Sequence, residues 1–196
     1  MSDAVLTQPR NLPLYATAKI CAGRTYIVTG ANTGLGYEAA KHLVELGAAK
    51  VVMGVRNTSA GETAKAEIET ATGKFNVAEV WALDLASYDS VKAFANKAVS
   101  QLAQIDGLIE NAGLAASQRS VAEGHLITVT VNVLSTFLLA LLLFPKMSES
   151  AKITGTSPHI VFVMSRTCFD SEEEWNKIKD DPLAKLDDEG MVVLKA

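Results

Sequence analysis

The stretch that decides the fold runs from Thr25 to Gly36 and reads TYIVTGANTGLG. Its first five residues are all β-branched or aromatic, which is typical of a buried strand. Helical spacing of apolar residues begins at Gly34 and continues to Leu46, just before Gly47. The pattern therefore predicts a strand, a glycine-rich turn and a helix in succession. This arrangement can cradle a phosphate group, because the free N–H groups of the helix N-terminus point at the turn.

The alternation of strand and helix continues through most of the chain. We predict further strands at 50–55, 77–83, 105–109 and 159–164, and further helices at 59–71, 87–102 and 123–146. Nearly continuous apolar strands that alternate with helices predict a parallel sheet covered on both faces. Because crossovers between parallel strands are right-handed, we expect a doubly wound α/β fold of the Rossmann type, with about five strands.

The length of 196 residues fits one domain. We expect an irregular lead-in at 1–23, the Rossmann domain at 24–169 and an acidic C-terminal segment at 170–196. The acidic segment holds nine acidic residues and four lysines, whereas the preceding part carries a net charge of +1. It is expected to be a solvated surface segment or, alternatively, a tail that binds a partner.

The composition argues against several classes of protein. A net charge of −4 disfavours a nucleic-acid binder, since such domains are basic. Cys21 and Cys168 have no neighbouring ligands at metal-binding spacing, so we expect no metal site. The N-terminus has no signal-peptide pattern, which favours a cytoplasmic location. Residues 126–144 carry no charge, but Thr, Ser and Asn residues interrupt them, which favours a buried helix over a membrane span.

The glycine-rich turn offers a separate role for each of its three glycines. Gly30 allows a tight turn after the strand, Gly34 lets the backbone approach a pyrophosphate, and Gly36 lets the helix pack closely on the sheet. The alternative is a glycine turn with a purely structural role. The predicted dinucleotide-binding loop consists of Gly30, Asn32, Thr33, Gly34, Leu35 and Gly36.

The glycine spacing G-x-x-x-G-x-G resembles that of the short-chain dehydrogenase/reductase family, and more loosely of its retinol-dehydrogenase-like branch. The resemblance runs from about Thr25 to Ser165. It rests on the glycine-rich turn and on four further motifs: Asp84-Leu85 after the third strand, Asn111-Ala112-Gly113 after the fourth, Asn132 in the long helix and Ser165 after the fifth strand. It implies a Rossmann fold and hydride transfer between a nicotinamide and a small-molecule carbonyl or secondary alcohol.

The end of the second predicted strand indicates which nicotinamide cofactor is bound. An acidic residue there would bind the ribose 2′-hydroxyl of NAD, but the first acidic residue is Glu62, inside the next helix. Arg56 instead offers a permanently charged donor to a 2′-phosphate, which favours NADP(H). The alternative is that Arg56 is an ordinary surface arginine.

The resemblance assigns further cofactor contacts. It implies that Asp84 and Leu85 meet the adenine ring, and that Asn111, Ala112 and Gly113 pass beside the adenosine ribose and brace the sheet. Glu110 stands where the family usually has an asparagine. A carboxylate beside an anionic cofactor is unfavourable unless it faces away, which the alternation of a strand allows.

The resemblance also implies that Ser165 binds the substrate oxygen and that Asn132 positions a water molecule. The family's Tyr-x-x-x-Lys pair is expected after Ser165, yet the last tyrosine is Tyr88. Three such pairs do occur: Tyr15–Lys19, Tyr37–Lys41 and Tyr88–Lys92. None is expected beside Ser165, so the chain is predicted to be truncated before the pair.

Three alternatives follow for the function. The first is an NADP(H)-dependent oxidoreductase of this family. The second is a catalytically impaired nucleotide-binding or interaction protein without the Tyr/Lys pair, and the third is non-redox chemistry in a retained pocket. The helix at 123–146 is expected to be incompletely covered, which makes it a possible surface for homo-oligomer formation.

Overall fold

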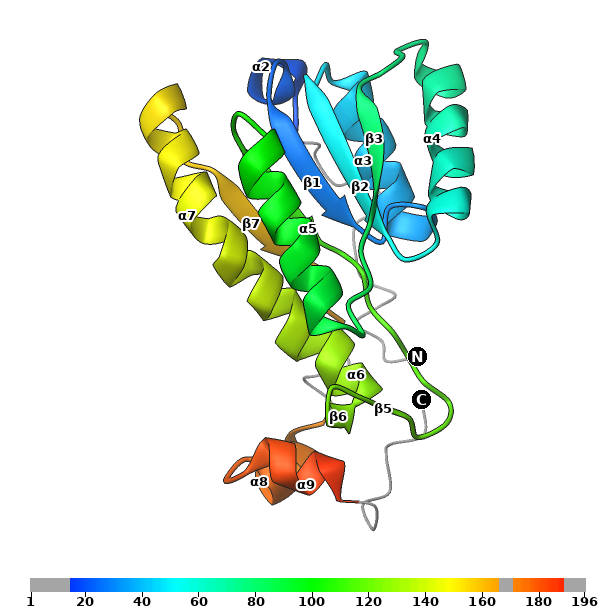
Figure 1. Ribbon diagram of the computed structural model, residues 1–196, viewed down its shortest axis with the longest axis vertical. Helices are drawn as coiled ribbons and strands as arrows, with labels where there is room; N and C mark the ends of the chain where they lie inside the picture. The colour runs from blue at the N-terminus through cyan, green and yellow to red at the C-terminus, as the bar shows by residue number, and fades with distance from the viewer. Residues whose placement is uncertain (1–14, 166–170, 189–196) are drawn as a thin grey trace.

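The structure is a computed structural model that describes residues 15–165 and 171–188. Five parallel strands form one sheet in the order β3-β2-β1-β4-β7 (Figure 1). The strands are β1 Thr25–Thr29, β2 Lys50–Val55, β3 Ala78–Ala82, β4 Gly107–Glu110 and β7 His159–Phe162. The chain moves outward from β1 to β3 and then returns to β4 on the other side of β1. This topology confirms the predicted α/β fold of the Rossmann type.

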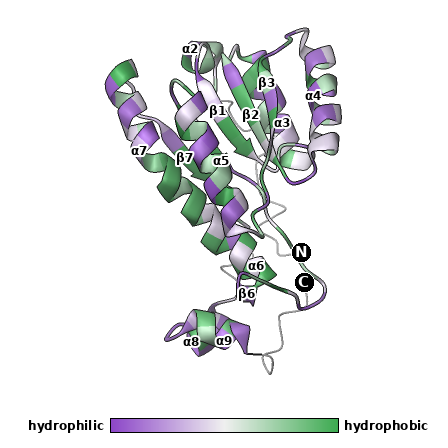
Figure 2. Cartoon of the chain, viewed as in Figure 1, coloured by the Kyte–Doolittle hydropathy of each residue, from purple (hydrophilic) through white to green (hydrophobic). Residues whose placement is uncertain are grey.

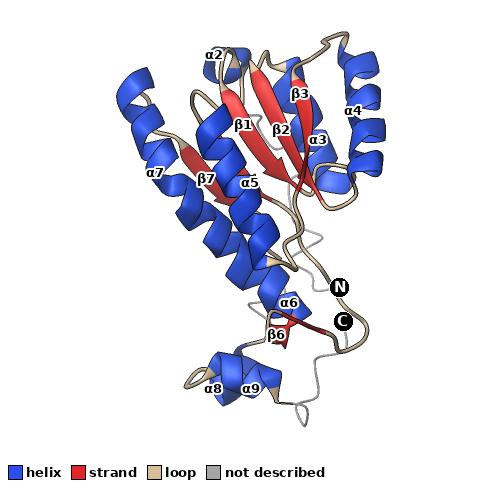
Figure 3. Ribbon diagram, viewed as in Figure 1, coloured by secondary structure: helices blue, strands red, loops and turns tan. Residues whose placement is uncertain are grey.

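Helices cover both faces of the sheet, as Figure 3 shows. The covering helices are α3 Gly34–Glu45 and α4 Thr58–Thr72 on one face, and α5 Tyr88–Gln101 and α7 Thr136–Thr154 on the other. Ile27 and Val28 of β1 are both fully buried, and they belong to different hydrophobic cores. Because successive strand residues point to opposite faces, a continuous apolar strand such as β1 supplies both cores at once.

The long helix does not begin at residue 123 as predicted. Glu123 and Gly124 have φ values of 53° and 85°, which a helix cannot accommodate. They form the turn of a short hairpin made by β5 Val121–Ala122 and β6 His125–Leu126. The helical stretch follows as α6 Ile127–Val129, the π-helix η1 Thr130–Ser135 and α7.

The long helix also ends later than the predicted residue 146. It continues through Pro145 to Thr154, and Gly155 terminates it with a left-handed φ of 67°. Burial of Leu143 and Met147 on either side of Pro145 offsets the hydrogen bond that proline removes.

The helical stretch Ile127–Thr154 is long and apolar enough to cross a membrane by length and composition alone. Its strongly hydrophobic character is visible in Figure 2. In the structure one face of α7 lies in the core, where Leu139 and Leu143 are fully buried. This packing against α5 and β4 supports a core helix.

The described part of the acidic segment, 171–188, contains two helices that were not predicted, α8 Glu172–Ile178 and α9 Pro182–Asp187. The first turn of α8 carries three glutamates, which favour a helix N-terminus. In α9, Pro182 occupies the first turn and the Asp181 side chain caps the Ala184 N–H. In the lead-in, which is described from residue 15 onward, α2 Ala18–Cys21 forms a short helix.

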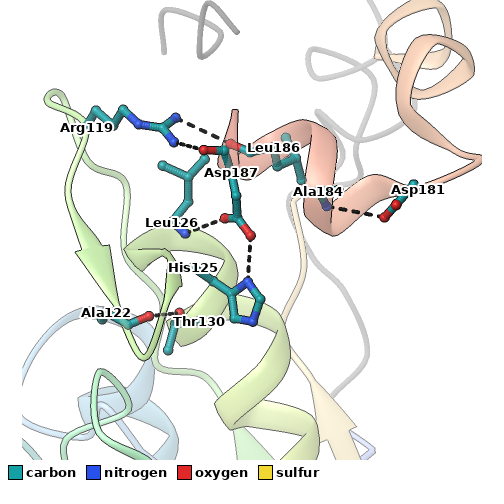
Figure 4. A network of polar contacts seen from close by, with 9 residues as sticks. All are labelled: Arg119, Ala122, His125, Leu126, Thr130, Asp181, Ala184, Leu186 and Asp187. Atoms are coloured by element: carbon teal, nitrogen blue, oxygen red, sulfur yellow. Dashed lines mark hydrogen bonds and ion pairs between the residues drawn. The ribbon is translucent and has the colours of Figure 1, made fainter. Parts of the chain in front are cut away.

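Side-chain contacts fix α9 against the β5–β6 hairpin, as Figure 4 shows. The Asp187 carboxylate lies 2.6 Å from Nδ1 of His125 and accepts the Leu126 N–H at 2.9 Å. The Arg119 guanidinium donates to the Leu186 and Asp187 carbonyls. Hydrogen bonds from His125 and from the Leu126 backbone lower the pKa of Asp187. The acidic segment is therefore anchored by at least one of its charges.

Candidate functional site: a nucleotide cleft at the carboxyl ends of the strands

Two glycines of the turn between β1 and α3, Gly30 and Gly36, leave little room for a side chain. Gly30 and Gly34 adopt φ values of 66° and 58°, a region that glycine enters without strain. A Cβ on Gly36 would lie 2.5 Å from the Gly30 carbonyl oxygen and also against the Asn111 side chain. The turn therefore brings the start of α3 into direct contact with the end of β1.

The N-terminus of α3 remains available to an anion. Thr33 precedes the helix, and its side chain makes no capping hydrogen bond. The first N–H groups of a 12-residue helix therefore keep their positive partial charge beside the turn. Thr33 and Leu35 are exposed at this end, so the predicted loop residues lie where a phosphate can reach the backbone.

A cleft of about 180 Å³ opens at the carboxyl ends of the strands next to this turn. In parallel α/β sheets ligands bind at this edge, where the strand order reverses. Seven residues predicted to bind the cofactor line the cleft: Gly30, Asn32, Arg56, Asp84, Leu85, Ala112 and Gly113. Four further lining residues were not predicted: Gly54, Leu83, Leu114 and Val131.

Gly54 carries a sequence signal from which its place in the cleft could be predicted. A glycine inside an apolar strand often marks a close approach of another backbone. Here the Gly54 carbonyl accepts the Gly30 N–H at 2.8 Å, which fixes the tight turn after β1. A Cβ on Gly54 would also approach Leu83 within 3.0 Å.

Arg56 and Asp84 occupy neighbouring strand ends. Arg56 follows β2 and is exposed, so its guanidinium is accessible from the cleft. Asp84 follows β3, where its carboxylate accepts the Ala86 N–H at 2.9 Å and its own N–H donates to Ser90. The cleft thus combines a cationic side chain and a fixed polar turn at the side away from β4.

Asn111 lies behind the glycine turn rather than in the cleft lining. Its Nδ2 donates to the Thr29 carbonyl at 3.0 Å and to the Gly30 carbonyl at 3.4 Å. The backbone N–H groups of Asn111 and Ala112 both donate to the Thr29 hydroxyl at 3.0 Å. These contacts tie the segment after β4 to the end of β1. Thr29 was part of the predicted motif but was given no role.

A second pocket of about 350 Å³ shares Ala112 and Gly113 with the cleft. Both predicted catalytic residues, Asn132 and Ser165, line it. Its other walls come from β4, η1, α7 and the end of β7, and they are mostly apolar. The structure therefore brings the predicted cofactor-binding and catalytic residues together along one continuous edge of the sheet.

The Asn132 amide is already engaged in two hydrogen bonds. Its Oδ1 accepts the Leu114 N–H at 2.8 Å and its Nδ2 donates to the Leu114 carbonyl at 2.9 Å. It lies in the π-helix η1, and such turns occur frequently at functional sites. Asn132, which lines the second pocket, therefore holds Leu114, which lines the cleft.

The three Tyr-x-x-x-Lys pairs lie elsewhere in the described part of the chain. Tyr15 is exposed before α2, Tyr37 packs on the α3 face of the sheet, and Tyr88 begins α5. None of these tyrosines lines the pocket that holds Ser165. The spacing alone therefore identifies no proton donor near this pocket.

Comparison with known proteins is consistent with this site. The family model described as short chain dehydrogenase matches residues 24–177. The short chain dehydrogenase/reductase dmxR8 of Cryptosporiopsis sp. is 47% identical over 145 residues, which cover 74% of this chain and 45% of that protein. The short chain dehydrogenase atnD of Emericella nidulans is 46% identical over 71% of this chain and 45% of its own length. The chain thus spans less than half the length of these relatives.

Solved structures share the fold. A metagenomic short-chain oxidoreductase in complex with NADP aligns with a TM-score of 0.59 and 28% identity, over 72% of this chain and 62% of that one. A short chain dehydrogenase from Escherichia coli CFT073 complexed with NADPH aligns with a TM-score of 0.58 and 26% identity, over 69% and 57%. From the family match, the fold and the motif positions together, the chain belongs to the short chain dehydrogenase family.

Proposed function

We propose that this chain binds NADP(H) in the cleft and supplies the cofactor-binding part of an oxidoreductase that acts on a small-molecule carbonyl or secondary alcohol. The observation that carries the proposal is the cleft itself, which joins Arg56 and Asp84 to the Gly30 turn. The similar structures with NADP and NADPH support the same cofactor. The retinol-dehydrogenase-like branch and a cytoplasmic location stay predictions.

The residues present fit a dinucleotide phosphate. The pyrophosphate would meet the uncapped N-terminus of α3, where Gly34 carries no side chain to block it. The 2′-phosphate would pair with Arg56, and the adenine would lie over Asp84 and Leu85. Gly113 is exposed at the boundary between the two pockets, where the nicotinamide end would pass.

The second pocket is the proposed place of the chemistry. A bound nicotinamide supplies or accepts a hydride, and the protein positions the substrate and handles the proton. We assign the Ser165 hydroxyl to the substrate oxygen. Asn132 acts as a positioning residue, because its amide fixes the Leu114 backbone.

One observation favours a second candidate function, nucleotide binding without efficient turnover: among the described residues, no tyrosine lines the pocket that holds Ser165. A positioned general acid contributes roughly 10²–10⁴-fold to such reactions. We therefore expect this chain to reduce carbonyl substrates slowly or not at all.

The test is NADPH oxidation by the purified chain with a panel of aldehydes, ketones and quinones. A rate near background is expected for the wild type and for Ser165→Ala alike. A high rate that Ser165→Ala abolishes would contradict the expectation, since another group would then carry the proton.

We also propose that α7 mediates self-association, as expected for the helix at 123–146. Phe137, Leu141 and Phe144 form one exposed stripe on this helix, and Leu141 is 70% exposed. Contiguous apolar patches of this kind mark interaction surfaces. Leu141→Lys is expected to lower the mass measured by light scattering toward that of a monomer.

Phe75→Lys is the matched control for this experiment, because Phe75 is 65% exposed but lies in the loop before β3. It is expected to leave the mass unchanged. A wild-type chain that is already monomeric at high concentration would contradict the proposal.

A further inference from the structure

The Thr29 hydroxyl at the end of β1 organises the joint between two loops of the cofactor cleft. Thr29 is fully buried, and its Oγ1 accepts the N–H groups of Asn111 and Ala112, both at 3.0 Å. A hydroxyl has two acceptor lone pairs and one hydrogen. Because both lone pairs are occupied, its hydrogen has to be donated to a third partner.

Two acceptors lie within reach of that hydrogen. Oε2 of Glu110 is 3.2 Å from the Thr29 hydroxyl, and the Ile109 carbonyl is at 3.5 Å. Hydrogen bonds weaken with distance, so the Glu110 carboxyl is the better acceptor. Glu110 is only 3% exposed and lies beside Thr29 on the adjacent strand β4.

The two loops that this hydroxyl joins, the glycine turn after β1 and the segment after β4, have little freedom to move relative to each other. Asn111 also donates its side-chain amide to the Thr29 and Gly30 carbonyls. The Ala112 Cα lies 3.0 Å from the position that a Cβ on Gly30 would occupy. Gly30 and Ala112 both line the cleft, so a shift of the segment after β4 would change the shape of its wall.

The environment of Glu110 favours the neutral, protonated form of its carboxyl group. Burial raises the pKa of Glu110 to about 8, although the hydrogen bond from Thr29 opposes this rise. Among the described residues, no charged group contributes to the shift. The described residues that surround Glu110 carry no charge: Thr29 on β1, Phe162 on β7, and Thr136 and Phe137 on α7. The raised pKa favours the protonated carboxyl at neutral pH.

We propose that Glu110 is a positioning residue for the cofactor cleft: it accepts the Thr29 hydroxyl hydrogen and so holds the Asn111 and Ala112 amides against the glycine turn. The inference rests on the proposed function, because the cleft that Glu110 shapes is the proposed NADP(H) site. No sequence motif assigns this role to a glutamate at position 110.

The direct test is amide hydrogen exchange measured by NMR on the full chain without cofactor. Glu110→Gln keeps a carbonyl acceptor of the same shape, whereas Glu110→Leu removes it and fills a similar volume. In Glu110→Leu the Asn111 and Ala112 amides are expected to exchange about tenfold faster, as for the loss of one hydrogen bond. Glu110→Gln is expected to restore protection, and the Ile27 amide should not change in either variant. Wild-type exchange at both amides in Glu110→Leu would overturn the proposal.

A second pair of variants covers the case in which Glu110→Leu does not fold. Thr29→Ser keeps the hydroxyl and Thr29→Val removes it. The readout is the titration of the Glu110 carboxyl by carbon-detected NMR. Because the hydrogen bond from Thr29 lowers the pKa of Glu110, this titration should move to higher pH in Thr29→Val and stay in place in Thr29→Ser. An unchanged titration in Thr29→Val would overturn the proposal.

NADPH titrations at several pH values test whether Glu110 affects the affinity for the cofactor. Glu110→Leu is expected to raise the Kd about tenfold at pH 7, with rescue by Glu110→Gln. In the wild type the Kd should rise above pH 8, since ionised Glu110 adds negative charge beside an anionic ligand, whereas Glu110→Gln should show no such rise. Identical pH profiles would overturn the link. A wild type that binds no NADPH would refute the proposed function, and the exchange experiment would still decide the role of Glu110.

Discussion

Gly36→Ala is expected to weaken NADPH binding by about 30- to 100-fold and to destabilise the chain by about 1–3 kcal/mol. The new Cβ would lie 2.5 Å from the Gly30 carbonyl oxygen and against the Asn111 side chain. Because the first of these contacts is with backbone, the helix α3 has to move away from the turn. That movement withdraws the N–H groups that would bind the pyrophosphate.

The measurements are a fluorescence titration with NADPH and thermal unfolding of the free chain. Gly73→Ala is the matched control, since Gly73 ends α4 with φ 65° and a Cβ there would meet nothing within 4 Å. It is expected to cost about 1–2 kcal/mol of stability through its left-handed conformation and to leave the NADPH affinity unchanged. Wild-type affinity in Gly36→Ala would contradict the assignment of this turn.

The second large effect is a loss of stability with rising pH that depends on Glu110. Burial raises the pKa of this carboxyl from 4.5 to about 8 in the folded chain. Between these values the unfolded chain has released the proton that the folded chain still holds. The contribution of protonated Glu110 to the free energy of unfolding is therefore complete below about pH 4.5. It is lost as the pH rises to about 8, by at most about 1.4 kcal/mol per pH unit.

Urea unfolding of the wild type and of Glu110→Gln at pH 5, 6, 7 and 8 isolates this contribution. The difference between the two free energies of unfolding should change steadily over this range and level off above pH 8, where both states of the wild type are ionised. Parallel profiles would show that Glu110 ionises in the folded chain at an ordinary pH.

The sheet could be predicted from the sequence because its signals are local. The strand β1 was predicted with its observed bounds, since five β-branched or aromatic residues precede a glycine. The start of the long helix could not be predicted in this way. The hairpin before it is held by Asp187, whose carboxylate contacts His125 and Leu126 from 61 or 62 residues away. Such contacts depend on tertiary packing, which periodicity does not reveal.

The candidate site likewise has a part that could be predicted from the sequence and a part that could not. The glycine turn, Arg56 and the Asp84 turn each come directly after a strand. Because the strands are parallel, these segments are expected to lie near one another at the same edge of the sheet. The role of Glu110 depends instead on its burial and on the Thr29 hydroxyl of the adjacent strand. From the sequence, Glu110 is an unusual residue at this position, unfavourable beside an anionic cofactor unless it faces away; in the structure it lines the second pocket. Among the described residues its Oε1 has no hydrogen-bond partner, and this and its raised pKa become evident only from the packing.

The most direct test of NADP(H) binding is a parallel titration of the wild type and Arg56→Ala with NADPH and NADH. A charge-assisted pair between Arg56 and the 2′-phosphate contributes about 1.5–3 kcal/mol, so the wild type should bind NADPH roughly 10- to 100-fold more tightly than NADH. Arg56→Ala should remove this preference and leave the NADH affinity unchanged. Equal affinity of the wild type for the two nucleotides would contradict the account.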